Sequence, residues 1–433
     1  MAVKKVNETR IVVTNLTCDN PWVNWSMMEK LGAKLNADDL EVLLDLVNCL
    51  GKAVHCTLDA VHLLKLVRNA FGDYKQFKNA KGDIINWEYI EKLHLLQLKE
   101  GVHCANKLTQ KHIDWKKDQM KVSYAAQTLS RSVATAIAFC RDELQLQDFA
   151  GSEAICEFLL TFNDLFDVLN SKSVRGKFLK GPLFEKTQKY WIPVLDNARK
   201  YILELCHNSN KPVVKGPRKQ PFLGFVSLID SVKLLFKEYV LHGELDYMLT
   251  FKLSQDHLEH FFNSVRAGLG RGNNPTTVQF TARFKRLLLG ATNKSSYGNC
   301  LSQDHIEIMS YPVETKEAVD LIASQFDLDA VDSWVDIYDR GQNLESDFKK
   351  NVCTYMSGYI QRKLQSKHDC VYCEENLKNS ETNTCDLIEE KNLGGLVKPH
   401  TDIESIVNVT DCILSQKIKG TMFFGYLIFF FNI

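Results

Sequence analysis

The stretch "AVHCTLDAVHLLKLVRNAFG", residues 53–72, changes its periodicity partway along. Its first six residues suit an extended strand, whereas apolar residues recur at helical spacing after Asp59. The apolar helical positions are Leu63, Leu64, Val67, Ala70 and Phe71. Gly72 stands where a helix commonly ends in a left-handed residue. The stretch predicts a strand that leads directly into a helix, with an acidic residue at the junction.

The residues before this stretch predict a strand in residues 9–20 and a short helix that closes near Gly32. From residue 87 to about residue 170 the pattern is helical almost throughout. Its clearest helices are expected in residues 121–144 and 153–171. These patterns predict an α+β fold that is mostly helical.

Further along, "NSNKPVVKGPRKQP", residues 208–221, is typical of a polar, basic loop. An amphipathic helix is expected in residues 222–240, and a smaller helical region after residue 291. No internal repeat is present.

The composition places the chain among ordinary globular proteins. It has 433 residues, of which 45% are hydrophobic and 24% charged, which is enough for two or three domains. The formal net charge is zero, so a surface that binds nucleic acid has to be local. Thirteen scattered cysteines and the polar start "MAVKKVNETR" favour a reduced compartment, cytosol or nucleus. The apolar end, residues 421–433, is shorter than the roughly 20 residues of a membrane span, so no membrane partner is expected.

A second informative stretch is "LSQDHLEHFFNSVRAGLGRGNNP", residues 253–275. Leu258, Phe261, Phe262 and Val265 follow the spacing of a core-facing helical stripe. Asp256 and Glu259 fall on the opposite face, three residues apart. Two acids on a helix usually form a solvated surface, but clustered carboxylates also bind Mg²⁺ for phosphoryl displacement on nucleic acid.

Asp59 is a further candidate ligand because an acid at the end of a strand commonly holds a catalytic metal. The helix after it also carries His62, Lys65, Arg68 and Asn69. Taken alone, Lys65 and Arg68 are expected on the solvated surface.

These residues resemble the P element transposases and the related THAP-domain transposases. The resemblance is carried by "LDAVHLLKLVRNAFG", by "QDHLEHFFNSVRAGLGRGNNPTTVQFTARFKRLL" and by "MSGYIQRKL" followed by "CVYC". It extends from about residue 12 to about residue 409. It implies a partial RNase H-like core interrupted by an all-helical GTP-binding insertion domain. The implied activity is metal-dependent DNA cleavage and strand transfer in the nucleus, with DNA (transposon ends or derived sites), GTP and a second copy of the chain as partners.

The resemblance also divides the chain. Residues 1–72 correspond to the N-terminal part of the RNase H-like core and residues 73–240 to the helical insertion domain with its basic loop. Residues 241–300 correspond to the C-terminal part of the core. Residues 301–433 form a helical region with a CxxC loop and an apolar tail.

Three acids form the catalytic set of this family, and the resemblance assigns the second to Asp59 and the third to Glu259, as Mg²⁺ ligands. The first lies on a strand upstream of the segment that resembles "VVTNLTCDN", and this chain begins just before that segment, so the first acid is expected to be missing. Asp19 follows a later strand and is in the wrong place to replace it. We therefore expect DNA cleavage by this chain to be impaired. The alternative is a domesticated, non-enzymatic nuclear scaffold that binds DNA or protein.

The insertion domain implies a GTP site. The residues that match the family's nucleotide contacts are Lys107, Val122, Ser130, Asp167, Asn170 and Asp256. A carboxylate can accept two hydrogen bonds from guanine, and a lysine can neutralise phosphate. No G-x-x-x-x-G-K-[ST] motif is present, so a P-loop GTPase is not expected. From the sequence alone, Asp167 and Asn170 are ordinary polar residues near a helix end.

Cationic residues follow the acids directly and suit a DNA backbone. They are Arg266, Arg271, Arg283, Lys285 and Arg286. The loop at 208–221 adds Lys211, Lys215, Arg218 and Lys219, with a solvated basic loop as the alternative. Cys370 and Cys373 are half of a Zn²⁺ site. His368, Cys353, Cys385 or His400 could complete it, and two reduced cysteines in a loop are the alternative.

Overall fold

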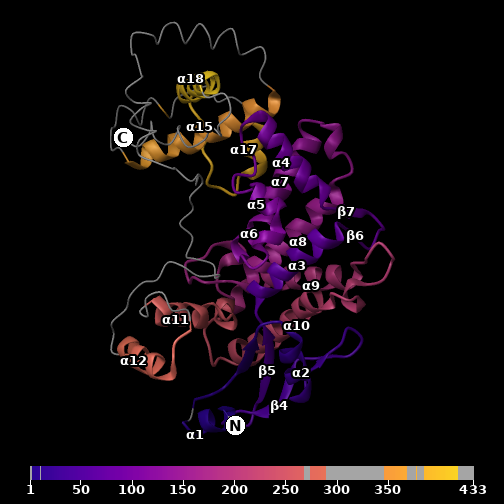
Figure 1. Ribbon diagram of the computed structural model, residues 1–433, viewed down its shortest axis with the longest axis vertical. Coiled ribbons are helices and arrows are strands. Elements are labelled where there is room, and N and C mark those ends of the chain that lie inside the picture. Colours follow the sequence, from indigo (N-terminus) through magenta and orange to yellow (C-terminus); the bar gives the residue numbers. More distant parts are fainter. Residues whose placement is uncertain are drawn as a thin grey trace. The chain divides into compact units, whose positions relative to one another are not determined.

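The computed structural model describes residues 2–9, 11–267, 274–288, 346–367, 377 and 385–417. The chain divides into two compact units (Figure 1). The first comprises residues 1–87, 111–131 and 157–305, and the second residues 88–110, 132–156 and 306–433. Most described residues are helical and the sheets are small, which confirms the expected α+β, mostly helical class. No helix in the described part of the chain is long and apolar enough to cross a bilayer.

A three-stranded sheet lies in the first unit. Its order is β1 (Asn15–Cys18), β5 (Ala53–Leu58) and β4 (Leu43–Val47). β1 runs parallel to β5, with Cys18 opposite Leu58, and β4 runs antiparallel to β5. β5 is buried along almost its whole length, as expected for a central strand covered on both faces. Its carboxyl end, beside that of β1, leads directly into the helix predicted from the sequence.

Two small hairpins accompany this sheet. β2 (Lys34–Leu35) pairs with β3 (Leu40–Glu41), and β6 (Gln76–Lys78) pairs with β7 (Ile84–Asn86). The predicted helix that closes near Gly32 is α2 (Trp22–Lys30), and Gly32 follows it with φ +107°. A short N-terminal helix, α1 (Ala2–Glu8), precedes β1.

Helices bury the sheet. α3 (Ala60–Tyr74) follows β5, and α10 (Lys219–Leu235) packs against β5, α3 and α9 (Gln188–Glu204). Gly224 permits this close packing, since a Cβ atom there would lie 2.5 Å from Leu63 Cδ2. α10 is apolar on most sides because it is enclosed, so it is less amphipathic than residues 222–240 suggest.

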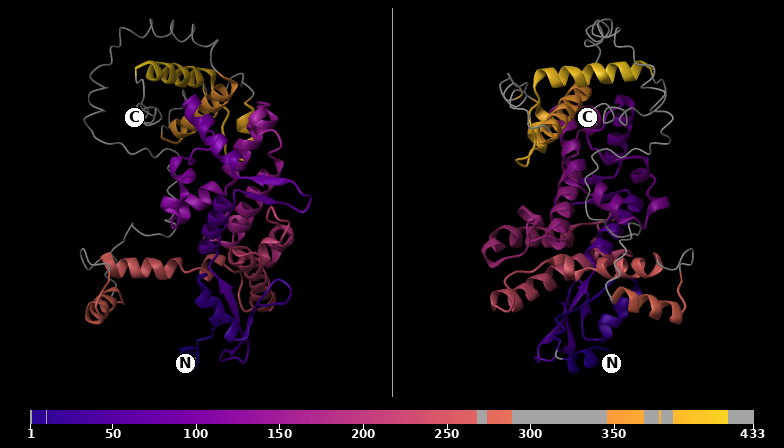
Figure 2. Two further views of the ribbon diagram at one scale, coloured as in Figure 1. Left: turned by 45° about the vertical axis from the view of Figure 1, so that its right-hand side comes forward. Right: turned by 90° about the vertical axis from the view of Figure 1, so that its left-hand side faces the viewer.

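The remaining helices of the first unit position the residues of interest. α6 (Val122–Thr128) packs on α3, and most of α8 (Glu153–Leu169) lies in this unit. α11 (Asp256–Ala267) and α12 (Thr277–Leu288) contact each other as successive helices (Figure 2). Phe71, Phe77, Phe158, Phe162 and Phe222 form an aromatic cluster, with the Phe71 and Phe158 rings 4.8 Å apart.

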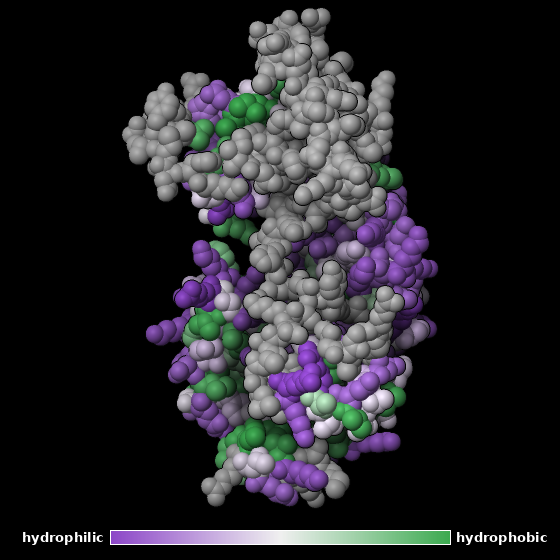
Figure 3. Space-filling view, turned by 60° about the vertical axis from the view of Figure 1, so that its left-hand side comes forward, coloured by the Kyte–Doolittle hydropathy of each residue, from purple (hydrophilic) through white to green (hydrophobic). Residues whose placement is uncertain are grey.

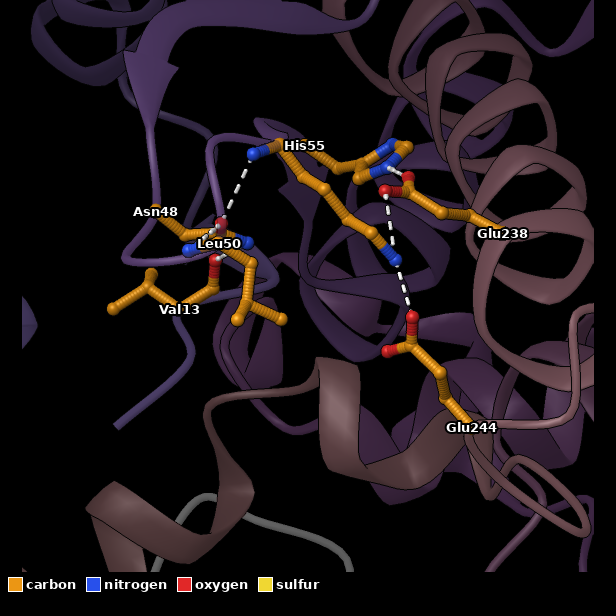
Figure 4. A network of polar contacts seen from close by, with 7 residues as sticks. Val13, Asn48, Leu50, His55, Glu238 and Glu244 are labelled. Carbon is orange, nitrogen blue, oxygen red and sulfur yellow. Dashed lines mark hydrogen bonds and ion pairs between the residues drawn. The ribbon is translucent and has the colours of Figure 1, made fainter. Parts of the chain in front are cut away.

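The turn between β4 and β5 is held by one side chain. The Asn48 carboxamide oxygen accepts hydrogen bonds from the backbone N–H groups of Leu50 and Lys52. Its amide nitrogen donates to the Val13 carbonyl at 3.2 Å (Figure 4). The turn is thereby fixed to the segment that leads into β1.

The same sheet is joined to a π-helical segment, Phe236–Leu241, by charged residues. His55 Nε2 lies 2.7 Å from Glu238 Oε2, and Lys52 Nζ lies 3.9 Å from the other oxygen of Glu238 and pairs with Glu244 (Figure 4). Because His55 is buried on β5, this network fixes the end of α10 to the central strand.

The second unit is helical. It contains α4 (Glu88–Glu100), most of α7 (Arg131–Asp142), α15 (Asp347–Lys367), α17 (Asp386–Lys391) and α18 (Thr401–Lys417). α15 packs on both α17 and α18. The pair between Lys349 Nζ and Asp411 Oδ2 joins α15 to α18, and Asp411 is buried.

Two expected helix boundaries are wrong. α3 continues past Gly72 to Tyr74 and ends at Lys75, whose φ is +62°. Gly72 lies inside the helix, and a glycine is needed there because a side chain would collide with the Trp115 ring. The helix expected in residues 121–144 is interrupted after Thr128, since Asn163 Oδ1 accepts from Arg131 N and the Ser130 hydroxyl donates to the Gln127 carbonyl.

Candidate functional site

Two aspartates follow the two parallel strands. Asp19 comes directly after β1 and Asp59 directly after β5, and Asp59 N donates to the Cys18 carbonyl at 3.0 Å. The carboxyl ends of parallel strands meet at one edge of a sheet, which is a common position for a catalytic group. Asp19 is partly exposed, and the Asn24 side-chain amide donates to it. The sequence analysis excludes Asp19 as a replacement for the first acid because it follows a later strand, and the pairing of β1 with β5 that brings it beside Asp59 is not visible in the sequence.

Asp59 has a structural function at this edge. Only 1% of the residue is exposed. Its Oδ1 accepts from Val61 N at 2.9 Å and caps α3, while its Oδ2 accepts from Gln255 N at 3.1 Å. The carboxylate therefore joins the start of α3 to the start of α11.

His62 connects Asp59 with Glu259. Its Nδ1 lies 3.2 Å from Asp59 Oδ2, and its Nε2 lies 3.5 Å from Glu259 Oε1. The Glu259 side chain is about one-third exposed, so it can still reach a ligand. The structure thus brings both predicted catalytic acids together, with an imidazole between them. Among the described residues, no three His, Cys, Asp or Glu side chains already form a metal-binding group.

The expectation that Lys65 and Arg68 lie on the solvated surface is wrong. Lys65 is 5% exposed and Arg68 is fully buried. Arg68 donates to Asn69 Oδ1 and to the carbonyls of Asp118 and Gln119, and burial lowers the pKa of its guanidinium to about 10. α3 turns its cationic face inward because α6 and the segment after Trp115 cover it.

The start of α11 also departs from its amphipathic pattern. Asp256 is 2% exposed, and burial, followed by the nearby charge of Asp59, raises the pKa of its carboxyl group. In contrast, Leu258 and Phe262 of the predicted core stripe are 47% and 43% exposed, while Val265 is buried. The predicted inward and outward faces are therefore partly exchanged. Exposed hydrophobic residues lie among hydrophilic ones on the face shown in Figure 3.

Asp256 lies beside the end of α8. Lys172 Nζ is 3.7 Å from Asp256 Oδ2, an oxygen that is buried and has no hydrogen-bond partner in the described structure. Thr250 Oγ1 donates to the Val168 carbonyl at 2.6 Å and accepts from Ser171 N at 3.0 Å. These bonds fix the segment before α11 to the residues that follow α8.

Asp167 and Asn170 lie at this end of α8. Burial raises the pKa of the Asp167 carboxyl group to about 6, although Lys180 Nζ lies 3.7 Å away and opposes the shift. The side-chain oxygen of Asn170 is buried without a hydrogen-bond partner among the described residues. Three of the predicted nucleotide contacts, Asp167, Asn170 and Asp256, are thus brought into one neighbourhood from distant parts of the sequence.

The other predicted nucleotide contacts differ in their setting. Ser130 stands beside Arg131, whose guanidinium pairs with Asp164 on α8 at 2.7 Å. Val122 is buried on α6, so its side chain is part of the core. Lys107 is exposed and belongs to the second unit.

The predicted DNA contacts lie on α11 and α12. Arg266, Lys285 and Arg286 are exposed, and Arg283 is partly shielded, with Nε and one terminal nitrogen lacking a hydrogen-bond partner among the described residues. Arg271 lies outside the described residues. Lys285 and Arg286 have no ion-pair partner within the described part of the chain, which leaves their charge available.

The basic loop is less available. Lys215 pairs with Asp38 at 2.7 Å, Arg218 pairs with Asp73, and Lys219 lies over the Trp22 ring. Lys211 is exposed and forms no ion pair with another described residue. Three of the four cations of this loop therefore contact other residues of the same chain.

The predicted Zn²⁺ ligands Cys370 and Cys373, with His368, lie outside the described residues. Cys353 and Cys385 are buried, and burial raises the pKa of the Cys385 thiol to about 11. His400 lies beside Asp402 at the start of α18. The Zn²⁺ site remains a prediction.

Family models match three parts of the chain. A TNP-like, GTP-binding insertion domain matches residues 61–182, and a TNP-like RNase H C-terminal domain matches residues 251–285. The C-terminal domain of DNA transposase THAP9 matches residues 343–423. The first two matches include Asp167 and Glu259, respectively.

Two curated proteins are similar over most of the chain. Human DNA transposase THAP9 is 26% identical over 439 aligned residues, covering 98% of this chain and 48% of the relative. The Drosophila melanogaster transposable element P transposase is 26% identical over 374 residues, covering 84% and 47%. This chain therefore spans about half the length of these relatives.

The fold has a solved counterpart. The Drosophila P element transposase strand transfer complex contains a chain that matches with a TM-score of 0.57 at 23% identity, covering 66% of this chain and 62% of that one. This likeness concerns the fold. The three family models and the two relatives show that the chain is similar to the P element and THAP9 transposases, with an RNase H-like core and an insertion domain of the GTP-binding type.

Proposed function

We propose that this chain acts as a nuclear, P element-like transposase relative. In this proposal it binds DNA and GTP, assembles with further copies of itself, and holds Mg²⁺ at the carboxyl ends of β1 and β5. The observation that carries the proposal is the gathering of Asp59, Glu259 and Asp19 around one edge of the sheet, from segments far apart in the sequence. A family match alone would not require these acids to lie together.

The carboxylates suit a divalent cation, which prefers hard oxygen ligands. Asp59 and Glu259 are the ligands that the sequence favours. The structure supports Asp19 and Glu259 as the ligands that face solvent, because both oxygens of Asp59 already accept backbone hydrogen bonds. Asp59 would then position the starts of α3 and α11 relative to each other, and His62 would keep Glu259 beside Asp59. When bound, the cation would activate a nucleophile and stabilise charge on a phosphate.

The nucleotide would bind beside α8. The Asp167 carboxylate can accept hydrogen bonds from the guanine N1–H and N2–H₂ groups, and Asn170 brings a buried oxygen without a partner in the described structure. Lys172, near Asp256, provides a positive charge at the same end of the helix. Because Asp256 also neighbours Asp59, bound GTP would lie next to the carboxylate site and could organise it.

DNA would contact the exposed cations of α11 and α12. These helices also expose Leu258, Phe262 and Val278, which favours a second function as a protein-binding scaffold. Binding of a DNA duplex at several salt concentrations separates the two. A transposase-like surface should lose affinity steeply as salt rises, whereas a protein-binding surface should not bind DNA.

The main test measures binding of Mn²⁺, as a probe for Mg²⁺, by calorimetry on the full chain. Asp19→Asn and Glu259→Gln should each weaken Mn²⁺ binding at least about tenfold while leaving the melting temperature close to that of the parent. Asp59→Asn should lower the melting temperature. If Asp59→Asn abolishes Mn²⁺ binding in a stably folded chain, Asp59 is itself a ligand. Unchanged binding in all three variants would refute a cation site at this edge.

The nucleotide part is tested by GTP calorimetry with Mg²⁺, comparing the parent with Asp167→Ala. Binding that the substitution abolishes supports the insertion-domain site. A folded parent chain that does not bind GTP would contradict it and leave the scaffold function.

A further inference from the structure

Lys65 is a buried cationic residue of α3. Lysine is almost never buried unless it is paired, because removing its charge from water is costly. Lys65 is nevertheless 5% exposed, and it makes no hydrogen bond or ion pair with another described residue. The burial of this charge therefore calls for compensating groups nearby.

The surroundings of Lys65 are strongly charged. Glu259, Asp59 and Asp19 act on it with negative charge, while Arg68, one turn along α3, opposes them. Burial lowers the pKa of the ammonium group, and the three acids counteract this effect. Lys65 also follows His62 by three residues on the same face of α3, and His62 lies between Asp59 and Glu259, so Lys65 lies next to the carboxylate cluster of the proposed cation.

Each neighbouring charged group has a contact with a residue other than Lys65. Asp59 accepts from Val61 and Gln255, Glu259 faces His62, and the amide of Asn24 donates to Asp19. Arg68 uses its nitrogens on Asn69 and on backbone carbonyls, so it is a structural cation. Lys65 differs because its three N–H donors remain available beside an acidic cluster.

We propose that Lys65 contacts a phosphate oxygen of a polynucleotide bound at the carboxylate cluster. The inference rests on the proposed function, since a polynucleotide reaches this cluster only if the cluster is the DNA-handling site. An ammonium group is a compact point charge with rotatable donors and suits a phosphate oxygen. Its location beside the acids would place that phosphate next to the bound cation.

This assignment has two consequences of opposite direction. A positive charge beside the acids opposes a divalent cation, so its removal should tighten cation binding. The same removal should weaken binding of a phosphate ligand. A lysine that only balances the acids in the folded protein would affect stability, and its loss would not weaken the phosphate ligand.

The experiment uses the full chain with Lys65→Met, Lys65→Gln and Lys65→Arg. Mn²⁺ binding is measured by calorimetry, and binding of a fluorescein-labelled DNA duplex is measured by anisotropy in Ca²⁺. We expect Lys65→Met and Lys65→Gln to bind Mn²⁺ severalfold more tightly and DNA about tenfold more weakly. Lys65→Arg should restore most DNA binding because it keeps the charge. Lys65→Gln provides a folded variant if Lys65→Met is unstable.

Glu259→Gln serves as the control for the underlying function. If the Lys65 variants bind DNA as well as the parent does while Glu259→Gln still weakens Mn²⁺ binding, the cation site stands and the phosphate contact is refuted. If Glu259→Gln and Asp19→Asn bind Mn²⁺ as the parent does, the proposed function itself fails. A lower melting temperature in the Lys65 variants with unchanged DNA affinity would assign Lys65 as a structural counter-charge and overturn the proposal.

Discussion

At the scale of single residues, Asp167 predicts a pH-dependent nucleotide affinity. Its pKa of about 6 lies well above the ordinary aspartate value, because burial disfavours the charged form. If the carboxylate binds guanine, GTP affinity should be constant from about pH 7 to pH 8 and fall by up to about tenfold per unit below pH 6. Calorimetry across this range measures it.

The contribution of Asp167 to the free energy of unfolding should depend on pH in the opposite direction to GTP affinity. Because the folded-state pKa of Asp167 is raised, the folded protein binds this proton more readily than the unfolded chain does. The stabilisation from this group is present at low pH and is lost as pH rises to about 6. Asp167→Asn removes both effects, so a variant that keeps the parent's pH profile of GTP binding would contradict the role of Asp167.

Asp59 gives a prediction about stability. Asp59→Ala removes the cap of α3 and the acceptor for Gln255 N, and should lower the free energy of unfolding by about 2 kcal/mol. Urea denaturation measures this change. Asp39→Ala, at an exposed ion pair with Lys34, is the control and should change stability by less than about 1 kcal/mol. Equal effects at both positions would show that Asp59 does not connect α3 and α11.

Asp59, Glu259 and Asp256 are recognisable as candidate functional residues from the sequence. Asp59 marks a change from strand to helix periodicity, and the other two lie opposite an apolar helical stripe. The sequence could not predict that Asp256 and Lys65 are buried. Helical periodicity divides a helix into faces but does not show which face another segment covers. Asp19 is excluded on sequence grounds for a related reason, since its position beside Asp59 depends on the pairing of β1 with β5.

At the scale of elements, the packing of α10 on α3 depends on Gly224. A methyl group there would approach Leu63 and Leu58, both fully buried. Gly224→Ala should therefore destabilise the protein by about 1–2 kcal/mol, although alanine favours a helix by about 1 kcal/mol. Thermal unfolding followed by circular dichroism measures the change. Leu234→Ala, at a half-exposed position of the same helix, should have a smaller effect, and the reverse order would refute the packing argument.

Element types were largely predictable, but boundaries depended on distant contacts. The strand-to-helix change at Asp59 was visible because the periodicity itself changes there. The interruption between α6 and α7 was not visible, because the Asn163 side chain that bonds Arg131 N comes from α8. Gly72 is not the helix end that its residue type suggests. A glycine is required there because the Trp115 ring leaves no room for a side chain, and not because the backbone is left-handed.

At the scale of the whole molecule, the two compact units predict separable unfolding. Asp411 on α18 is buried against Lys349 of α15, so Asp411→Ala should destabilise the second unit by about 3 kcal/mol. GTP affinity at low denaturant should remain unchanged, since the proposed contacts Asp167, Asn170 and Asp256 belong to the first unit. Denaturation monitored by GTP binding and by circular dichroism would then give different midpoints. Coincident midpoints that shift together would contradict this independence.

The interleaving of the units was beyond the sequence patterns. Periodicity reports local structure, whereas each unit draws residues from three separate segments. The resemblance to transposases supplied the idea of an insertion, but the assignment of individual segments to a unit depends on tertiary contacts.

The bond from Gln255 N to Asp59 Oδ2 spans 196 residues and has a consequence for synthesis on the ribosome. At about 5–20 residues per second, the nascent chain waits roughly 10–40 s between the emergence of the two partners. The apolar strand β5 lacks its α10 cover during most of that interval. This is the window in which a chaperone would be needed, and chains terminated before residue 219 should aggregate instead of accumulating as a smaller folded protein.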